Sequence, residues 1–183
     1  MTINFATNRL VFRMLCSDDL EFMLKLTGNP EVVRYLPGMI TDEGMMHSWL
    51  SSVQPEDNEY LICLKETGEP IGECSLTLQE NDSSCEIGYM LLPQYWNQGY
   101  GTEVAEWLMS MARAYDVLRI TAMTHAQNTA SVSILEKLGF KKNSIGWMLF
   151  EASDGLHDNQ IDCYMYEKET NILSSEESEH EDG

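Results

Sequence analysis

The sequence predicts a single α+β domain built around a central sheet that is mixed and largely antiparallel. Three strand-like runs joined by short polar turns lie within residues 59–92, and a strand–helix–strand unit continues to residue 124. A crossover through a helix requires its two strands to run parallel or nearly so. Because no internal repeat and no long linker interrupts residues 1–168, we expect one domain over that range.

The N-terminal part is predicted to hold one strand and two helices. Residues 9–14 (RLVFRM) predict the strand, and Asp18 with Glu21 three residues later is typical of a capping box at a helix start. The second helix is expected to begin near Thr41, with apolar side chains on one face. The members of that face would be Met45, Met46, Trp49 and Leu50.

The remaining elements follow from alternation, helical spacing and turn residues. A long helix is expected from about Thr102, and a second one from about Asn128 to Leu138 is stopped by Gly139. Apolar runs bounded by turn residues predict the strands of this part. The expected strands are 59–65, 71–78, 85–92, 117–124, 145–150 and 160–167.

The net charge excludes two classes of partner. The chain has 183 residues, with 30 acidic and 11 basic side chains, for a formal net charge of −19. Lys and Arg supply the attraction to nucleic acids and to anionic membranes, so we expect neither as a partner. Neither a run of 18 apolar residues nor a signal-like N-terminus occurs, and we therefore expect a cytoplasmic protein.

Acidic side chains are concentrated in the C-terminal segment. Residues 169–183 contain six acidic residues and no Lys or Arg, and subtracting these six from the total leaves −13 on residues 1–168. From Ser174 onward the segment has no apolar residue, so burial cannot offset the entropy of ordering it. We expect residues 169–183 to form a disordered acidic tail, with a docking tail for a basic partner as the alternative.

The five cysteines and four histidines do not predict a metal site. The cysteines are widely spaced without a Cys-x-x-Cys pair, and the histidines are scattered, whereas a zinc site needs clustered ligands. Cys63, Cys74 and Cys163 lie in apolar runs, where a free cysteine usually acts as a small buried hydrophobe. We therefore expect reduced, structural thiols and no metal cofactor.

A glycine-containing loop before the long helix is the strongest indication of a ligand site. After Pro93 the chain carries Gly99 and Gly101 directly before the helix. Glycine lets the backbone take unusual angles and lets a ligand approach closely, while the free amides of a helix start attract an anion. An ordinary tight turn is the alternative, and the loop matches neither the P-loop nor the Rossmann pattern.

Two polar residues at the start of the next helix have two interpretations. Asn128 can cap that helix, and Ser131 is an ordinary residue of its first turn. A capping amide can also bond a ligand that lies across the helix start, so both interpretations stay open.

Several motifs in order and at matching spacing resemble the GNAT family of N-acetyltransferases. They also resemble its RimJ/RimL-like branch, which includes acetyltransferases of ribosomal-protein N-termini. The likeness covers about residues 8–168. The motifs are Glu86-Ile-Gly-Tyr, Pro93, Trp96-x-x-Gly99-Tyr-Gly101-Thr-Glu103, Asn128-x-x-Ser131 and Glu136-Lys-Leu-Gly-Phe140.

The resemblance implies acetyl transfer from acetyl-CoA to an amine. It also implies that two central strands splay apart and that the pantetheine arm of acetyl-CoA lies between them. The backbone of one strand end would bond pantetheine, the glycine loop would hold the pyrophosphate, and the next helix would face the donor. The residues implied are Met90, Leu91 and Leu92 for pantetheine and Gln98, Gly99, Tyr100, Gly101 and Thr102 for pyrophosphate. Asn128 and Ser131 would face the donor from the next helix.

The catalytic residues are less clearly indicated. Leu135 stands where many relatives carry a tyrosine that acts as general acid, so that role is not carried over. Direct attack by an amine needs a proton acceptor and a proton for the leaving thiolate. Glu86 is the candidate base, with an ordinary solvent-facing carboxylate as the alternative. Ser131 is the candidate donor to the thiolate, and Tyr164 is a weaker one.

The acceptor predicted from charge is a cationic primary amine. An acidic body attracts a cation over long range, and peptide N-termini, polyamines and aminoglycosides all carry such amines. The alternative function is a non-catalytic acyl-CoA-binding module that acts through a partner. A homodimer formed through the C-terminal strands also stays open.

Overall fold

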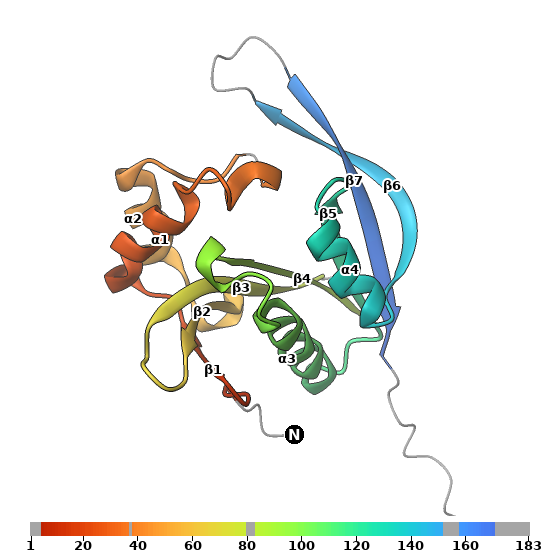
Figure 1. Ribbon diagram of the computed structural model, residues 1–183, viewed down its shortest axis with the longest axis horizontal. Coiled ribbons are helices and arrows are strands. Elements are labelled where there is room, and N and C mark those ends of the chain that lie inside the picture. The colour runs from red at the N-terminus through yellow and green to blue at the C-terminus, as the bar shows by residue number, and fades with distance from the viewer. Residues whose placement is uncertain (1–4, 37, 80–82, 152–157, 171–183) are drawn as a thin grey trace, which may run out of the picture.

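The computed structural model describes residues 5–36, 38–79, 83–151 and 158–170, with side chains described outside residues 146–162. Within these ranges the chain forms a seven-stranded sheet in the order β1-β2-β3-β4-β5-β7-β6, with helices on both faces (Figure 1). The strands are β1 Leu10–Met14, β2 Glu59–Leu64, β3 Pro70–Leu78, β4 Ser84–Leu91, β5 Arg119–His125, β6 Lys141–Glu151 and β7 Asp158–Glu169. The α-helices are α1 Leu20–Thr27, α2 Glu43–Ser52, α3 Tyr100–Ala114 and α4 Thr129–Lys137. Four short 3-10 turns are η1 Ser17–Asp19, η2 Val33–Tyr35, η3 Pro55–Asp57 and η4 Pro93–Tyr95.

The predicted fold class is confirmed. Every strand pair is antiparallel except β4 and β5, which run parallel because α3 carries the chain back across the sheet. The hairpin of β6 and β7 extends past the end of β5, since β5 pairs with β7 only from Cys163 onward (Figure 1). The sheet is therefore mixed and largely antiparallel.

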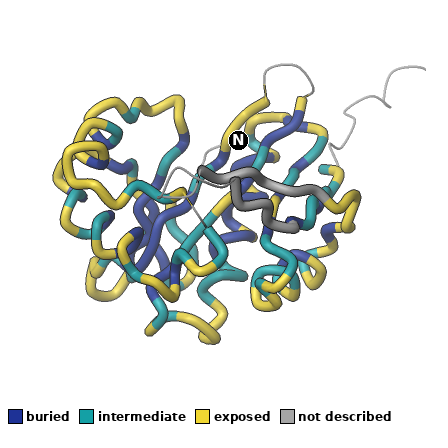
Figure 2. The backbone as a smooth tube through the Cα atoms, turned by 90° about the horizontal axis from the view of Figure 1, so that it is seen from above, coloured by how far each residue is buried: buried dark blue, intermediate teal, exposed yellow. Residues whose placement is uncertain are grey.

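Alternating side chains of the strands build two separate cores, one on each face of the sheet. On β2, Tyr60 and Ile62 belong to the core that contains α3, whereas Leu61 between them packs with α1 and α2. Figure 2 shows the buried residues (dark blue) along the strands and the exposed residues (yellow) on the outer loops and helix turns. Because neighbouring residues of one strand face different helices, the position of a residue along the strand decides which face of the sheet its side chain lies on.

Aromatic stacking fixes α3 against the first two strands. The ring of Trp107 stacks on Phe12 with centroids 3.7 Å apart and planes 3° apart, and it meets Tyr60 edge-on at 5.1 Å. Such pairs add to the stabilisation that comes from burying the rings. The start of α3, where the glycine loop lies, is thereby held at a set position beside β4.

The start of α1 differs from the prediction. The expected capping box of Asp18 and Glu21 is wrong: the 3-10 turn η1 precedes α1, and the reciprocal cap joins Cys16 to Asp19. Asp19 accepts the amide of Cys16 at 3.0 Å while its side chain is buried. The sequence pattern missed this cap because cysteine is not among the residues preferred at an N-cap, and Asp19 in addition pairs with Arg13 on β1.

The buried face of α2, the C-terminal strands and the tail also differ from the predictions or lie partly outside the described residues. Met45 is 61% exposed and does not join the buried face of α2. Both C-terminal strands are longer than predicted, and β7 includes Glu169, which had been assigned to the tail. The rest of the tail, residues 171–183, lies outside the described ranges.

The cysteines that were expected to be buried thiols are free and buried in the described residues. The five cysteines are free, and all but Cys16 are buried. No α-helix in the described ranges has both the length and the apolar content needed to cross a bilayer. Those ranges also contain no cluster of three or more His, Cys, Asp or Glu side chains arranged to hold a metal ion.

Candidate active site

The two central strands part in the middle of the sheet. The strands β4 and β5 pair only over Ser84–Glu86 and Arg119–Thr121. Beyond Glu86, β4 continues to Leu91 with β3 as its partner, and β5 continues to His125 with β7 as its partner. The facing edges of β4 and β5 therefore carry backbone groups without a strand partner, and an extended ligand can bond to such edges.

The three backbone positions predicted to hold pantetheine are not equivalent. The amide of Leu92 donates to the oxygen of Ile71 at 2.9 Å, and its carbonyl accepts from Tyr95 at 3.0 Å, so both groups are used inside the chain. Alternation along the strand places the backbone of Met90 on the same β3 side. The backbone of Leu91 faces the opposite edge, where its carbonyl accepts the indole N–H of Trp96 at 2.7 Å. The amide of Leu91 is therefore the donor that faces β5.

The predicted anion cradle lies at the start of α3. Gly99 is the N-cap residue with a φ of 80°, a left-handed conformation that glycine adopts without strain. Within the described residues, no amide N–H from Gln98 to Thr102 donates a hydrogen bond of normal geometry. The positive end of a 15-residue helix adds to these donors. The arrangement can bind an anion such as a pyrophosphate.

Gly101 also packs closely against neighbouring elements. A Cβ placed on Gly101 would lie 3.1 Å from Cδ1 of Ile134 and 3.3 Å from the ring of Tyr89. Glycine at this position therefore allows α3 to pack closely against β4 and α4 without displacing these two side chains. Because that packing brings α3 and α4 together, the free amides and the start of α4 border one site.

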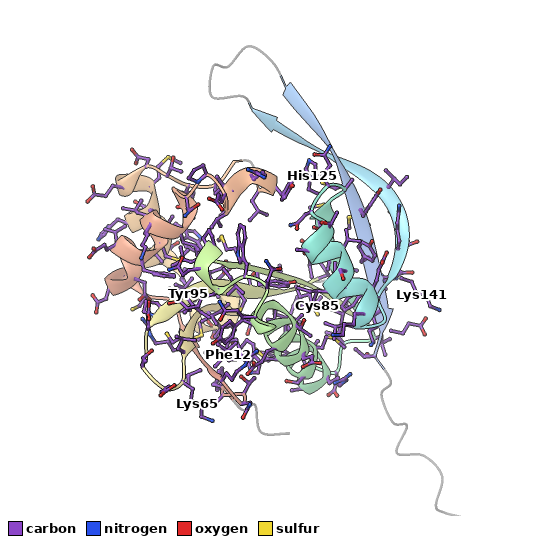
Figure 3. All side chains as sticks on the ribbon, viewed as in Figure 1. Phe12, Lys65, Cys85, Tyr95, His125 and Lys141 are labelled. Atoms are coloured by element: carbon purple, nitrogen blue, oxygen red, sulfur yellow. The ribbon has the colours of Figure 1, made fainter. Side chains whose placement is uncertain are left out.

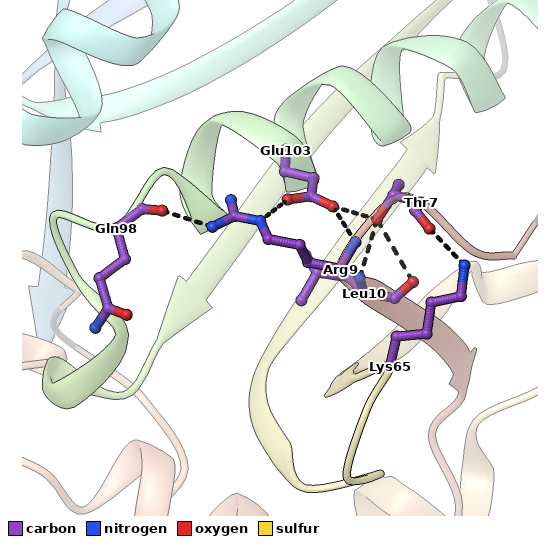
Figure 4. Close-up of polar contacts among 6 residues, drawn as sticks. All are labelled: Thr7, Arg9, Leu10, Lys65, Gln98 and Glu103. Carbon is purple, nitrogen blue, oxygen red and sulfur yellow. Dashed lines mark hydrogen bonds and ion pairs between the residues drawn. The ribbon is translucent and has the colours of Figure 1, made fainter.

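A tether from the segment just before β1 holds the glycine loop (Figure 4). The guanidinium of Arg9 donates to the carboxylate of Glu103 at 2.7 Å and to the carbonyl oxygen of Gln98 at 2.8 Å. It also lies over the ring of Tyr100, 4.2 Å from the centroid. Glu103 further accepts from Thr7 at 2.6 Å, and this network lowers the pKa of Glu103 although partial burial acts in the opposite direction. One arginine thus contacts both sides of the anion cradle.

At the start of α4, the structure bears on both interpretations of Asn128 and Ser131. The side chain of Asn128 caps the helix by accepting the amide of Ser131 at 3.2 Å. Ser131 itself is half-buried, and its hydroxyl makes no hydrogen bond of normal geometry within the described chain. The capping role of Asn128 is therefore observed, while the Ser131 hydroxyl stays available.

Tyr89 brings a hydroxyl to this site that the sequence did not single out. The hydroxyl is buried without a hydrogen bond of normal geometry in the described chain, although the Ser131 side chain is close enough to influence it. Burial raises the pKa of Tyr89 to about 12, and Ser131 lowers it to a smaller extent. A buried hydroxyl without a partner is costly unless a ligand satisfies it. Its position in the Glu86-Ile-Gly-Tyr motif was the available signal.

Glu86 lies at the point where β4 and β5 separate. It is the last residue of β4 paired with β5, opposite Thr121, and it is half-buried. Burial raises the pKa of its carboxyl. Side chains of Glu86 and Met90 share the face covered by α1 and α2, whereas Tyr89 points to the face of α3 and α4. A group lying between the strands can thus be reached by a carboxylate from one face and by hydroxyls from the other.

The ends of the two strands are flanked by aromatic residues. Figure 3 labels Tyr95, which follows β4, and His125, which ends β5. The ring of His125 lies 5.0 Å from that of Tyr35 in η2, so the segment between α1 and α2 contacts the β5 side of the site. Residues of the α1–α2 segment therefore border the region in which an acceptor would have to bind.

This geometry coincides with a known family. The family model of the acetyltransferase (GNAT) domain matches residues 9–141, which include β4, the glycine loop and the start of α4. The chain belongs to the GNAT acetyltransferase family. The residues at the start of α3 fit the pyrophosphate of acetyl-CoA, because the amides of the cradle are free and the Tyr89 hydroxyl beside them has no hydrogen bond of normal geometry in the described chain.

Relatives of this GNAT chain include proteins named as acetyltransferases. It is 29% identical over 169 residues to an uncharacterized N-acetyltransferase p20 of Bacillus licheniformis, covering 87% of this chain and 92% of that protein. It is 30% identical over 147 residues to the uncharacterized N-acetyltransferase YoaA of Bacillus subtilis, with 76% and 83% covered. The fold matches a ribosomal-protein-S5-alanine acetyltransferase from Vibrio fischeri with a TM-score of 0.77 at 16% identity, covering 93% of this chain and 98% of that one.

Proposed function

We propose that this GNAT acetyltransferase moves an acetyl group from acetyl-CoA to the primary amine of a cationic acceptor, as a RimJ/RimL-like enzyme. The observation that carries the proposal is that β4 and β5 no longer pair beyond Glu86, and that free amides at the start of α3 lie at the end of the gap between them. The RimJ/RimL-like assignment rests on the sequence motifs and on a neighbour in fold that acetylates a ribosomal protein, as its name states.

The donor would be held along the unpaired edges and at the helix start. The amide of Leu91 is the strand donor for the pantetheine arm, and the amides from Gln98 to Thr102 are the donors for the pyrophosphate. Ser131 and the hydroxyl of Tyr89 face the same region from α4 and β4. Acetyl-CoA supplies a reactive thioester carbonyl and a thiol leaving group when bound.

The acceptor nitrogen must lose a proton before it can attack, and Glu86 is the proposed base. A carboxylate whose pKa is raised by burial takes up a proton more readily at neutral pH than an exposed carboxylate does. Glu86 can accept this proton directly or through a water molecule.

Ser131 is the proposed group that hydrogen-bonds the leaving sulfur. The Tyr89 hydroxyl beside it adds a second donor, and Leu135 is buried instead of presenting a hydroxyl. The two roles would be carried by opposite faces of the sheet, with the reacting carbonyl between them.

The test measures thiol release from acetyl-CoA with a panel of N-terminal peptides, polyamines and aminoglycosides. We expect Glu86→Gln and Ser131→Ala each to lower kcat at least about tenfold, because general acid–base groups contribute at this scale or above. Acetyl-CoA affinity, measured by calorimetry, should change less than kcat in both variants. Glu66→Gln in the β2–β3 turn and Ser133→Ala on the exposed side of α4 are the matched controls.

The outcomes separate the proposal from its alternative. Tight acetyl-CoA binding without turnover of any amine in the panel would favour a non-catalytic acyl-CoA-binding module that acts through a partner. Wild-type turnover in both variants would contradict the assigned roles while leaving the acetyl transfer itself intact. A base of raised pKa also predicts that kcat/KM rises with pH along an acidic limb, and Glu86→Gln should remove that limb.

A further inference from the structure

A cavity of about 210 Å³ lies between the α1–α2 layer and the strands β2 to β4. Its lining is apolar except for two carboxyl groups, one hydroxyl and the indole N–H of Trp49. The hydroxyl belongs to Thr27 and is already within hydrogen-bond distance of the carbonyl oxygens of Met23 and Ile40, at 2.9 and 2.7 Å. The lining residues are Met23, Thr27, Met39, Ile40, Met46, Trp49, Glu59, Glu73 and Met90.

The two carboxyl groups face each other inside this apolar cavity. Glu73 on β3 is opposite Leu61 on β2, and Glu59 lies two residues before Leu61, so both glutamates share one face of the sheet as diagonal neighbours. Glu73 is only 7% exposed, and its side-chain hydrogen-bond partner is Glu59. The nine described lining residues contain no Lys, Arg or His. Among the described residues that line the cavity, the pair therefore has no cationic partner.

This arrangement is unfavourable for the protein alone. Burial raises the pKa of Glu73, and the charge of Glu59 raises it further. Burial also raises the pKa of Glu59; the hydrogen bond with Glu73 lowers it to a smaller extent, and the charge of Asp57 raises it. Two adjacent carboxyls in such surroundings share one proton more readily than they both ionise. A cation that entered the cavity would replace that proton and satisfy both groups.

The position of the pair relative to the separated strands limits the shape of the ligand. Glu73 lies opposite Met90, and β4 lies between Glu73 and the region where the donor would bind. Neighbouring strands are about 4.8 Å apart, so the pair lies about 7 Å from the middle of that region. A nitrogen bound by the pair is therefore too distant to attack the thioester, and the reacting nitrogen must be at the other end of the same molecule.

We propose that Glu59 and Glu73 anchor the non-reacting ammonium of an α,ω-diamine acceptor whose methylene chain lies among the methionines of this cavity. An extended chain advances about 1.25 Å per bond, so about four to six methylenes span the distance to the donor. This inference rests on the acetyl transfer proposed above and names its acceptor class. On binding, the ammonium enters and the shared proton leaves to solvent, so the pair exchanges one positive charge for another and the net charge of the cavity does not change.

The first test compares 1,5-diaminopentane with n-pentylamine, which has the same chain and only one amine. In thiol-release assays the diamine should show a KM at least about tenfold lower, because a charge-assisted contact to a buried carboxylate is gained. Glu73→Gln and Glu59→Gln should each remove most of this advantage, so that the KM values for the diamine and for pentylamine approach each other. Glu66→Gln, an exposed carboxylate in the β2–β3 turn, is the matched control and should keep the full advantage.

The second test measures binding without acetyl-CoA. Calorimetry of 1,5-diaminopentane in buffers of different ionisation enthalpy should report a released proton, and Glu73→Gln should abolish both the binding heat and the proton release. 1,3-Diaminopropane is too short, and spermidine places a further ammonium among the methionines, so both should bind more weakly. Glu73→Gln removes a carboxyl whose raised pKa disfavours the folded state at neutral pH, so the variant should stay folded.

Each outcome has a distinct meaning. Turnover of peptide N-termini together with equal KM values for the diamine and pentylamine would overturn the anchor and leave the acetyl transfer standing. Glu73-dependent diamine binding without turnover of any amine would keep the anchor and overturn the proposed reaction. A diamine advantage that persists in both glutamate variants would place the second ammonium elsewhere and contradict the proposal.

Discussion

At Asp19, burial and ion pairing act in opposite directions on one carboxylate. Burial raises its pKa, but hydrogen bonds from Arg13 at 2.8 and 2.5 Å and from the amide of Cys16 at 3.0 Å outweigh burial, and the net pKa is lowered. The carboxylate joins the end of β1 to the start of α1, which carries two residues of the methionine-lined cavity. A contact distant from the reaction thus helps to set the position of one cavity wall.

Replacing Asp19 by Asn should destabilise the protein by about 2 kcal/mol at neutral pH, the scale of a hydrogen bond to a charged group. Because the folded-state pKa lies below the unfolded value near 3.8, the stability from this carboxylate is present above that value and is lost as pH falls below it. Urea unfolding from pH 7 to pH 3 should therefore show the difference from the parent shrinking at the acid end. Exposed Asp18→Asn should cost less than 0.5 kcal/mol or so throughout.

Among the elements, α3 connects the structural core to the proposed donor site. Its apolar side, including Trp107, packs against β1 and β2, while its first turn presents free amides. Arg9 on the segment before β1 bonds Glu103 and the carbonyl of Gln98, and therefore fixes the loop from both ends. The cradle is thus positioned by contacts 89 to 94 residues apart in the chain.

Removal of the Arg9 tether should weaken donor binding without abolishing the reaction. We expect Arg9→Ala to raise the KM for acetyl-CoA about fivefold, since a charge-assisted hydrogen bond and a cation–π contact are lost together. The KM of Arg9→Lys for acetyl-CoA should lie between those of the parent protein and of Arg9→Ala, because lysine keeps the charge but not the planar fork of the guanidinium. Arg113→Ala at the opposite end of α3 is the control, and an equal rise there would indicate a general charge effect instead of a tether.

The charge of the whole molecule acts on its two proposed substrates in opposite ways. The net charge of −19 repels an anionic donor, so the local amides at the start of α3 must supply the attraction. The same charge attracts a cationic acceptor, and the buried carboxyl pair extends that preference into the cavity.

Raising the ionic strength should therefore separate the two substrates. Between 50 mM and 500 mM NaCl, kcat/KM for a cationic amine should fall about threefold to tenfold as long-range attraction is screened. The KM for acetyl-CoA should stay level or decrease, because repulsion is screened as well. Steady-state kinetics with each substrate varied in turn provide the measurement, and a parallel loss for both substrates would contradict electrostatic steering.

Features that depend on a few neighbouring residues could be predicted from the order of the amino acids alone. The mixed sheet, the helix caps at Asp42 and Asn128, the left-handed Gly139 after α4 and the free amides behind Gly99 all follow from local spacing and backbone chemistry. The caps and the turn at Gly139 can be predicted because their hydrogen bonds join residues only three or four positions apart, and the strand directions follow from the length of each connection.

Contacts between side chains that are distant in the chain depend on how the strands align in the folded protein. The pairing of Arg13 with Asp19, the burial of the Tyr89 hydroxyl and the contact of Glu59 with Glu73 depend on strand register, which a single sequence does not reveal. A shift of one residue between β2 and β3 would move Glu73 to the opposite face of the sheet. The acidic composition could therefore predict a cationic acceptor, but the register placed two carboxyls in one cavity.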